Sequence, residues 1–244
     1  MPDIEREKEL ERILENLPTE ELSLAVSVPT RNRFYELEDP ESPITVRAMR
    51  FEDERALADH RRKGADAVNF LLERCVSNIS ISQLFSVDKL AILFKIREAT
   101  YGPRYRINLA CPSCKETTSV DIDINKDLVL NALPEDFSDP RTITLPNLGK
   151  SMKIRIPKTT DEKYLTGDVY PNLWRFVREI DGCVHKEIIN EVLTRLPVED
   201  MHILLKEISL TKYGLQPCMS YECPSCGKEK EVDIPITEDF FLGT

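Results

Sequence analysis

The sequence has little of several residue types on which common enzyme classes depend. Its 244 residues include only eight glycines and three histidines, His60, His185 and His202. So few glycines count against folds that bind nucleotides through glycine-rich loops, and no histidine belongs to a His-Glu-x-x-His motif or a comparable pair. There is also no Gly-x-Ser-x-Gly sequence. The sequence therefore predicts no catalytic residues, no cofactor-binding residues and no small-molecule substrate.

Long apolar runs are lacking as well. No segment approaches the roughly 18 consecutive apolar residues that a membrane span needs, and the charged start MPDIEREKELERIL does not resemble an export signal. Apolar residues make up 41% of the chain, charged residues 31%, and the formal net charge is −10. These values are typical of a globular protein without a membrane partner, and the excess of acid disfavours a broad phosphate-binding surface.

Cysteine, by contrast, is plentiful, and four of the seven cysteines form two identical tetrapeptides. Cys-Pro-Ser-Cys occurs at residues 111–114 and again at residues 223–226. Without an export signal we expect a reducing compartment, in which structural disulfides are rare. Paired Cys-x-x-Cys elements in such a compartment typically bind a metal ion.

The chain reads as an internal duplication, which is the strongest organisational feature of the sequence. Residues 111–124 match residues 223–236 at eight of fourteen positions, and VRAMRFEDERAL at 46–57 aligns with IRIPKTTDEKYL at 154–165. The predicted parts are an N-terminal helix with an extended arm (1–36), copy one (37–124), a linker (125–144), copy two (145–236) and a tail (237–244).

Both copies are expected to have the same order of elements, which predicts an α+β fold made of a duplicated helical unit with short β-hairpins. A short alternating strand comes first, at 44–50 and 152–157, and a turn at 145–150 feeds the second one. Helices are predicted at 52–63, 65–77 and 86–100 in copy one and in PNLWRFVREI, KEIINEVLTRL and VEDMHILLKEISL of copy two. A Tyr-Gly pair ends the last helix of each copy, and two strands flank each Cys-Pro-Ser-Cys turn.

The two turns together predict a zinc-ribbon-like site that joins the copies. Each turn offers two thiolates, and a two-fold relation between the copies would bring the turns together. We therefore predict a structural Zn²⁺ bound by Cys111, Cys114, Cys223 and Cys226. Thioredoxin-like redox chemistry is an alternative for a Cys-Pro-x-Cys motif, but its reactive cysteine lies at the start of a helix, and strands are predicted here.

The remaining cysteines are not expected to bind the metal. Cys75-Val76 aligns with Cys183-Val184, and both cysteines are predicted to be buried thiols in helices. Cys218 has no counterpart in copy one, and its role stays open. Because zinc ribbons often bind nucleic acid, an adaptor of that kind is the alternative function, although acidic and basic residues alternate around the turns and form no continuous phosphate track.

Two terminal segments lie outside the repeats. Residues 3–17 predict an amphipathic helix whose apolar stripe includes Leu10 and Ile13, and this helix would pack on its own domain or dock on a partner. The tail contains the adjacent aromatic residues Phe240 and Phe241. We expect them to dock as well, either on this chain or in a pocket of a partner.

Four stretches resemble one known family. VRAMRFEDERAL, LLERCV, VDKLAILFKIREATYGPRYRINLACPSC and VDIDI lie in this order within residues 40–165. Together they resemble the baseplate hub subunit of T-even-type contractile-tailed phages, a family also described as a hub assembly chaperone. The most specific part is KIREATYG followed by a strand and CPSC.

The resemblance implies a non-enzymatic tail protein that acts in building the central hub. Its implied partners are other baseplate hub proteins and the tape measure protein. Its implied locations are the host cytoplasm during assembly and the tail baseplate of the virion. From the residues alone, an acidic duplicated protein with a zinc staple between its halves is likewise an assembly or scaffold component.

Overall fold

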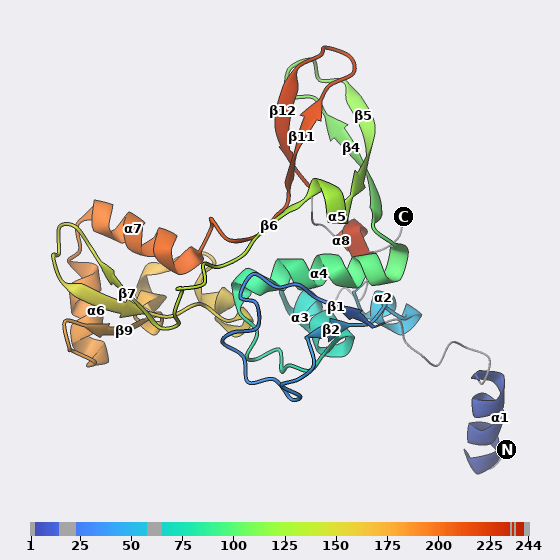
Figure 1. The fold of residues 1–244 in the computed structure, drawn as a ribbon, viewed down its shortest axis with the longest axis horizontal. Helices are drawn as coiled ribbons and strands as arrows, with labels where there is room; N and C mark the ends of the chain where they lie inside the picture. Colours follow the sequence, from blue (N-terminus) through green and yellow to red (C-terminus); the bar gives the residue numbers. More distant parts are fainter. Residues whose placement is uncertain (1–2, 15–22, 58–64, 235, 237, 242–244) are drawn as a thin grey trace.

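The structure is a computed structural model that describes residues 3–14, 23–57, 65–234, 236 and 238–241. Its helices and antiparallel strands agree with the predicted α+β class. Figure 1 shows a central unit around the long helix α4, a second unit beside it with α6 and α7, and a stalk of two β-ribbons above the central unit. Within the described ranges, none of the helices has the length and hydropathy of a membrane span.

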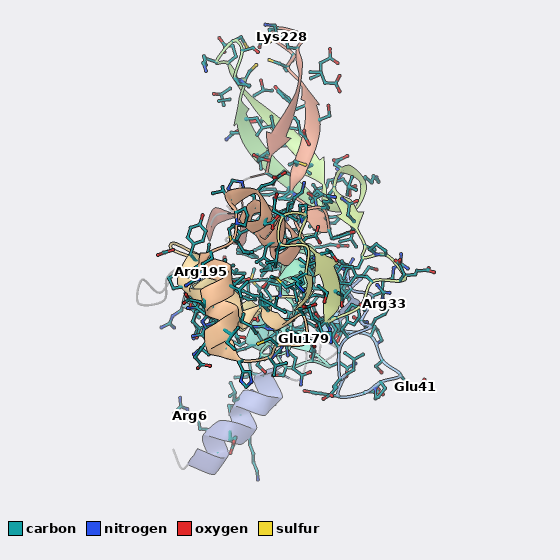
Figure 2. The ribbon with its side chains drawn as sticks, turned by 90° about the vertical axis from the view of Figure 1, so that its left-hand side faces the viewer. Arg6, Arg33, Glu41, Glu179, Arg195 and Lys228 are labelled. Carbon is teal, nitrogen blue, oxygen red and sulfur yellow. The ribbon has the colours of Figure 1, made fainter. Side chains whose placement is uncertain are left out.

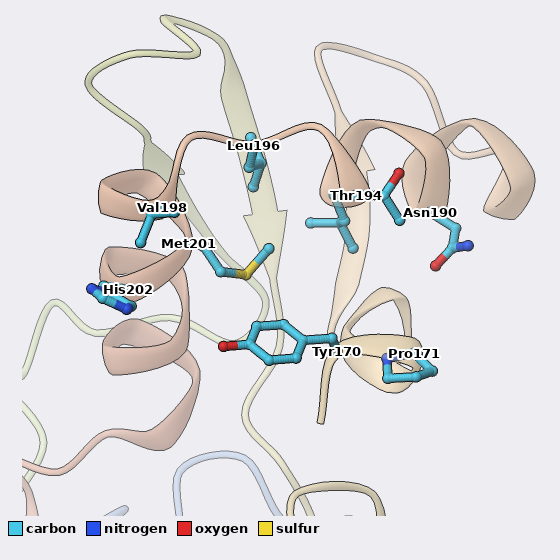
Figure 3. Close-up of a pocket in the computed structure, with 9 residues that line it drawn as sticks. Tyr170, Pro171, Asn190, Thr194, Leu196, Val198, Met201 and His202 are labelled. Atoms are coloured by element: carbon cyan, nitrogen blue, oxygen red, sulfur yellow. The ribbon is translucent and has the colours of Figure 1, made fainter. Parts of the chain in front are cut away.

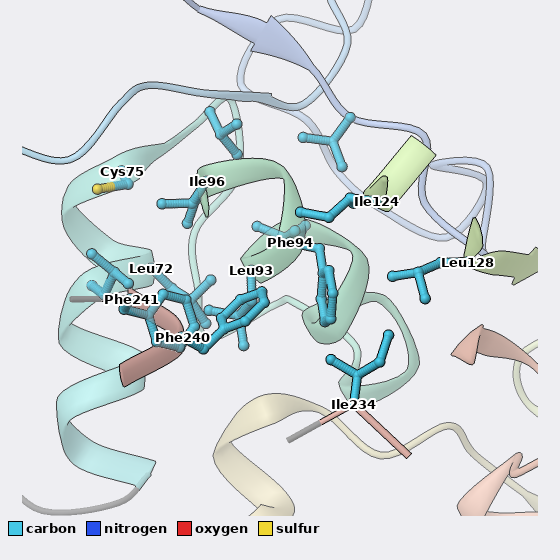
Figure 4. Packing of buried hydrophobic residues seen from close by; sticks show 14 of the residues in the cluster. Leu72, Cys75, Leu93, Phe94, Ile96, Ile124, Leu128, Ile234, Phe240 and Phe241 are labelled. Atoms are coloured by element: carbon cyan, nitrogen blue, oxygen red, sulfur yellow. The ribbon is translucent and has the colours of Figure 1, made fainter. Parts of the chain in front are cut away.

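The central unit is built around α4 (Ser86–Tyr101). A three-stranded antiparallel sheet and two helices pack around it, namely β1 (Leu24–Ala25), β2 (Thr45–Val46), β3 (Val76–Ser77), α2 (Phe51–Leu57) and α3 (Ala65–Cys75). Figure 4 shows Leu72 and Cys75 of α3 on the same side of the core as Ile96 of α4. Cys75 is fully buried there, as predicted for a core thiol at the end of a helix.

The end of α4 lies where the sequence predicts it. The last helical residue is Tyr101, and Gly102 follows with φ 83°. The N–H of Gly102 donates to the carbonyl oxygen of Glu98 at 2.8 Å. Glycine takes this positive-φ conformation without the steric penalty of a side chain, so the helix stops and the chain turns into the first ribbon.

The second unit has a sheet of the same order, made of β7 (Arg141–Thr144), β8 (Ser151–Ile154) and β9 (Val177–Ile180). Two 3₁₀ helices and two α-helices complete it, η1 (Thr159–Tyr164), η2 (Tyr170–Arg175), α6 (Lys186–Thr194) and α7 (Val198–Ser209). Met152, Leu173, Phe176 and Leu204 lie fully buried in its core. The predicted turn at 145–150 joins β7 to β8.

The prediction of a helix at PNLWRFVREI is wrong. Residues 170–175 form only the short η2, and the chain then becomes β9. Strand β9 pairs with β8, where Met152 lies opposite Ile180 and Ile154 lies opposite Val177. The order of apolar residues in this segment fits a helix as well as a strand. Pairing with β8 decides for the strand, because the backbone of the segment completes the sheet.

The stalk contains four longer strands in two hairpins. They are β4 (Arg104–Ala110), β5 (Thr117–Asp123), β11 (Cys218–Glu222) and β12 (Glu229–Asp233). The segment expected to be a linker contains the short helix α5 (Ile124–Asp127) and the strand β6 (Val129–Asn131), which pairs with β10 (Gly214–Gln216). Thus the chain leaves the base of the first ribbon and returns beside the same point to start the second ribbon.

One buried arrangement occurs in both units. Arg47 donates to the carboxylate of Asp53 at 2.8 Å, and Arg155 donates to that of Asp161 at 2.6 Å. In each case the backbone N–H three residues before the aspartate also donates to it at 2.8 Å. These charge-assisted hydrogen bonds keep the pKa of Asp53 at about 2 even though burial acts to raise it.

The sequence alignment of Cys75 with Cys183 does not match the backbone pairing. The N–H of Arg47 donates to the carbonyl of Cys75, whereas the N–H of Arg155 donates to that of Phe176, both at 2.9 Å. Cys183 instead lies in a turn after β9 and is only partly buried, so its predicted helical position is wrong.

The helix end predicted at Tyr213-Gly214 is also wrong, because α7 already ends at Ser209, followed by Leu210 with φ 53°. Gly214 serves a different purpose. It starts β10 against α4, where a Cβ atom would lie 3.2 Å from the carbonyl oxygen of Val87. A glycine therefore allows the returning strand to approach the helix closely.

The two units meet in a shared apolar cluster around Phe85, Leu133, Ile156 and Leu210. The N–H of Ser86 donates to Pro157 at 2.9 Å across this junction. Lys89 of α4 and Glu162 of η1 form an ion pair at 2.6 Å. The second unit is therefore fixed to the start of α4 by both apolar and polar contacts.

Asp88, in the first turn of α4, is fully buried next to this junction. Its carboxylate accepts hydrogen bonds from the N–H and hydroxyl of Thr30 and from the hydroxyl of Tyr35. Burial nevertheless raises the pKa of Asp88 to about 6, because desolvation disfavours the charged form more than these donors favour it.

The two termini behave differently. In α1 (Asp3–Leu14), Leu10 and Ile13 are 54% and 61% exposed, so the helix does not pack these side chains on its own chain. In α8 (Glu238–Phe241), Phe240 and Phe241 are buried in the core of the central unit, where Phe240 lies 4.6 Å from Phe94 between ring centres (Figure 4). The predicted docking of the tail thus takes place on the same chain.

Candidate metal centre

The two ribbons of the stalk face each other with their apolar sides. Strand alternation places Ile107 and Ile122 of the first ribbon inside, and Tyr221 of the second ribbon is buried with them. The polar residues between them point outward. A two-stranded hairpin is only marginally stable alone, so each ribbon supplies the apolar surface that the other needs.

The turns at the tips of the two ribbons have the same backbone geometry. The N–H of Lys115 donates to the carbonyl of Cys111, and the N–H of Gly227 donates to that of Cys223, both at 2.8 Å. Lys115 and Gly227 both take the left-handed conformation, with φ of 66° and 65°. This conformation closes each turn tightly and aims both of its thiols at the other ribbon. Figure 2 shows the tip of the stalk, marked by Lys228.

The four predicted cysteines come together at this tip. Their sulfur atoms all lie within 4.8 Å of one another. Cys111 Sγ is 3.8 Å from Cys226 Sγ, and Cys114 Sγ is 3.7 Å from Cys223 Sγ. The first cysteine of each turn thus meets the second cysteine of the other turn, as a two-fold relation requires. The cluster could hold one metal ion.

The two shortest contacts between the turns, at 3.7 and 3.8 Å, fit a tetrahedral thiolate shell. Zinc–sulfur bonds of about 2.3 Å place the sulfurs of a regular tetrahedron about 3.8 Å apart. Cys111 and Cys223 are 1% exposed, and Cys114 and Cys226 are partly exposed. An ion between them would be bound on all four sides by sulfur and would have no open position for a substrate or a reactive water molecule.

The surroundings of the four cysteines favour thiolates bound to a metal ion over four protonated thiols. The backbone N–H groups of Cys114 and Ser113 point at the Cys111 thiol and lower its pKa to about 6. The N–H of Glu116 also lowers the pKa of Cys114, but burial and the neighbouring thiols raise it to about 12. Four adjacent thiolates repel one another, and a divalent cation that replaces the protons removes this repulsion.

Among the described side chains, the outer face of the stalk shows no continuous basic track. Arg106 forms a two-pronged ion pair with Asp121 across the first ribbon, at 2.6 and 2.9 Å. On the second ribbon, Glu222 lies opposite Glu229 in register. Phosphate-binding surfaces need accessible cations without such acidic neighbours, so the described charges disfavour the alternative of a nucleic-acid adaptor.

The other residues considered in the sequence lie away from this centre. Cys218 lies in β11 opposite Asp233, outside the cluster. His185 precedes α6 and His202 lies on α7, while His60 falls outside the described residues. Within the described ranges, these four cysteines are the only group of three or more metal-ligating side chains close enough to share an ion.

Comparison with known families decides the identity at the level of family. The model of a family described as "T4 bacteriophage base plate protein" matches residues 30–242. The chain belongs to this family. The match includes both ribbons and all four cysteines, and it confirms the resemblance to a T4-type phage baseplate protein. Comparisons with curated proteins and with solved structures give no significant match. This baseplate protein is thus a structural component of a phage tail.

Proposed function

We propose that this baseplate protein is a non-enzymatic component or assembly factor of the baseplate hub, and that one structural Zn²⁺ joins the two halves of its duplicated chain. One observation carries the proposal. Four thiols from two turns that are 109 residues apart in sequence converge within 4.8 Å of one another. A closed site of this kind stabilises a fold and performs no chemistry on a substrate.

The duplication is supported by the two halves of the structure. Both contain a three-stranded antiparallel sheet of consecutive strands, a later α-helix and a ribbon with a Cys-Pro-Ser-Cys turn. The pair of Arg47 with Asp53 recurs as Arg155 with Asp161. The two copies share one stalk, because the second ribbon packs against the first and not against its own helices.

Metal analysis tests the zinc proposal. The purified protein should contain one zinc per chain, and X-ray absorption should give four sulfur neighbours at about 2.3 Å. A variant with Cys111→Ser and Cys114→Ser should contain none, whereas Cys218→Ser should keep the full content. A zinc content of zero or of two per chain would contradict a single shared site.

Partner analysis tests the hub proposal. The family places the chain in the baseplate, and we propose other hub proteins and the tape measure protein as its contacts, first in the host cytoplasm. A tagged chain expressed during infection should co-purify with hub intermediates. Co-purification only with proteins of the outer baseplate would refute the hub assignment. Mass spectrometry of purified particles then separates a permanent component from an assembly factor that leaves.

A further inference from the structure

The second unit has an apolar cavity that no other described part of the chain fills. It measures about 570 Å³, and most of its lining is apolar. The lining residues come from η2, α6, the following loop and α7, and they include Tyr170, Leu193, Val198 and Met201. Figure 3 shows the α6 and α7 sides of the cavity with Tyr170 between them.

The rim of this cavity leaves large apolar side chains in water. Val198 is 70% exposed and Tyr170 is 57% exposed. The volume lies within the range of roughly 300–1,000 Å³ that is usual for ligand sites. Grooves between helices that expose apolar rims typically receive the apolar face of another helix.

Helix α1 exposes apolar side chains that no described part of the chain covers. Leu10 and Ile13 are three residues apart, so they lie on one face of the helix, and both are more than half exposed. In the part of the chain that the structure describes, no hydrogen bond or ion pair joins α1 to another element. A helix of 12 residues is marginal in water without tertiary contacts. It therefore needs a surface on which to pack.

We propose that α1 of a second copy of this chain docks Leu10 and Ile13 into the cavity of the second unit, and that the exchange is reciprocal. The cavity of the same chain is a poor choice, because Figure 1 places α1 and the second unit at opposite ends of the longest dimension. Reciprocal exchange buries both unpartnered surfaces of each chain. It also closes as a two-fold dimer, the most common symmetry of homo-oligomers.

The expected dimer is measured by sedimentation velocity on the full chain. At concentrations up to about 100 μM, where modest affinities are populated, the wild type should sediment with twice the monomer mass of 28.1 kDa. Ile13→Glu and Val198→Glu should each give a monomer, because a buried carboxylate without a partner is strongly disfavoured. Phe51→Glu, at a position 75% exposed on α2, is the matched control and should stay dimeric.

Mixing the two variants makes the test specific. Helix α1 of the Val198→Glu chain is intact, and the cavity of the Ile13→Glu chain is intact as well. Their mixture should therefore form a heterodimer, in which α1 of the Val198→Glu chain docks into the cavity of the Ile13→Glu chain, although each variant alone is monomeric. Because both positions are exposed, thermal unfolding followed by circular dichroism should show that the body of either variant stays folded.

Three outcomes would overturn the proposal. The first is a wild type that stays monomeric over the whole range, which would mean that α1 is free, docks on its own body or waits for another protein. The second is a dimer that persists in Ile13→Glu and in Val198→Glu. The third is a mixture of the two variants that stays monomeric while each variant alone dissociates as expected.

Discussion

Removing one of the two cysteine turns should destabilise the protein as much as removing both. A tetrahedral zinc shell needs all four thiolates, so Cys111→Ser with Cys114→Ser leaves a pair that holds no structural ion. Cys223→Ser with Cys226→Ser has the same consequence. The quadruple variant then has no metal left to lose, and its free energy of unfolding should equal that of either double variant.

The magnitude follows from the loop that the ion closes. Cys114 and Cys223 are 109 residues apart. In the chain-entropy model, a cross-link over a loop of that length stabilises the folded state by about 5 kcal/mol at 25 °C. The binding free energy of a structural zinc, on the order of 10 kcal/mol, is coupled to folding. It is therefore the upper limit of the stability that a variant can lose. Each variant should therefore lose roughly 5–10 kcal/mol relative to the zinc-loaded wild type.

The free energies of unfolding of the two double variants and the quadruple variant are measured by urea unfolding in excess zinc, monitored by far-UV circular dichroism. Cys218→Ser is the matched control, because this cysteine lies in the same ribbon but outside the cluster, and it should unfold like the wild type. A chelator should bring the wild type to the level of the variants and leave the variants unchanged. Losses that add up in the quadruple variant would refute a single shared site.

Three further predictions concern single residues. Lys115→Gly should raise the free energy of unfolding in urea by roughly 1 kcal/mol, because lysine is strained at the φ of 66° that Gly227 takes freely in the other turn. Phe240→Ala should lower it by about 3–5 kcal/mol through the cavity left in the core, and a loss below about 1 kcal/mol would contradict the docking of the tail. The folded-state pKa of Asp88, about 6, exceeds its unfolded value, so this residue stabilises the fold at low pH. Its contribution should disappear as pH rises from about 4 through 6, by up to about 3 kcal/mol, and Asp88→Asn should flatten this part of the pH profile.

The convergence of the four cysteines could be predicted because two short local motifs carry it. Two identical Cys-Pro-Ser-Cys turns specify two half-shells, and the repeat supplies a reason for them to meet. The end of α4 could be predicted for the same reason, since Gly102 caps that helix. The same pair at Tyr213-Gly214 gave a wrong helix end, because α7 already stops at Ser209, so a local signal predicts correctly only where the packing around it agrees.

Features that depend on distant partners were not predictable in this way. The apolar residues Leu173, Phe176 and Val177 fit a helix as well as a strand, and only the unpaired edge of β8 decides for the strand. The cavity beside α6 takes residues from several elements, so no local pattern predicts it. The N–H of Arg155 donates to the carbonyl of Phe176, where the sequence alignment predicts Cys183. This pairing likewise depends on packing.

The path of the chain explains why the proposed metal ion at the tip of the stalk would matter for the whole molecule. After the first ribbon the chain builds the second unit, which the cluster around Phe85 and Leu210 fixes to the start of α4. It then returns through β10 and rises again as the second ribbon. Residues of both ribbons, including Ile107, Ile122 and Tyr221, share one apolar cluster, and Phe240 docks at the base of the stalk beside Phe94. The proposed ion would also hold the ribbons together at the tip, so the path of the chain would be closed at both ends of the stalk.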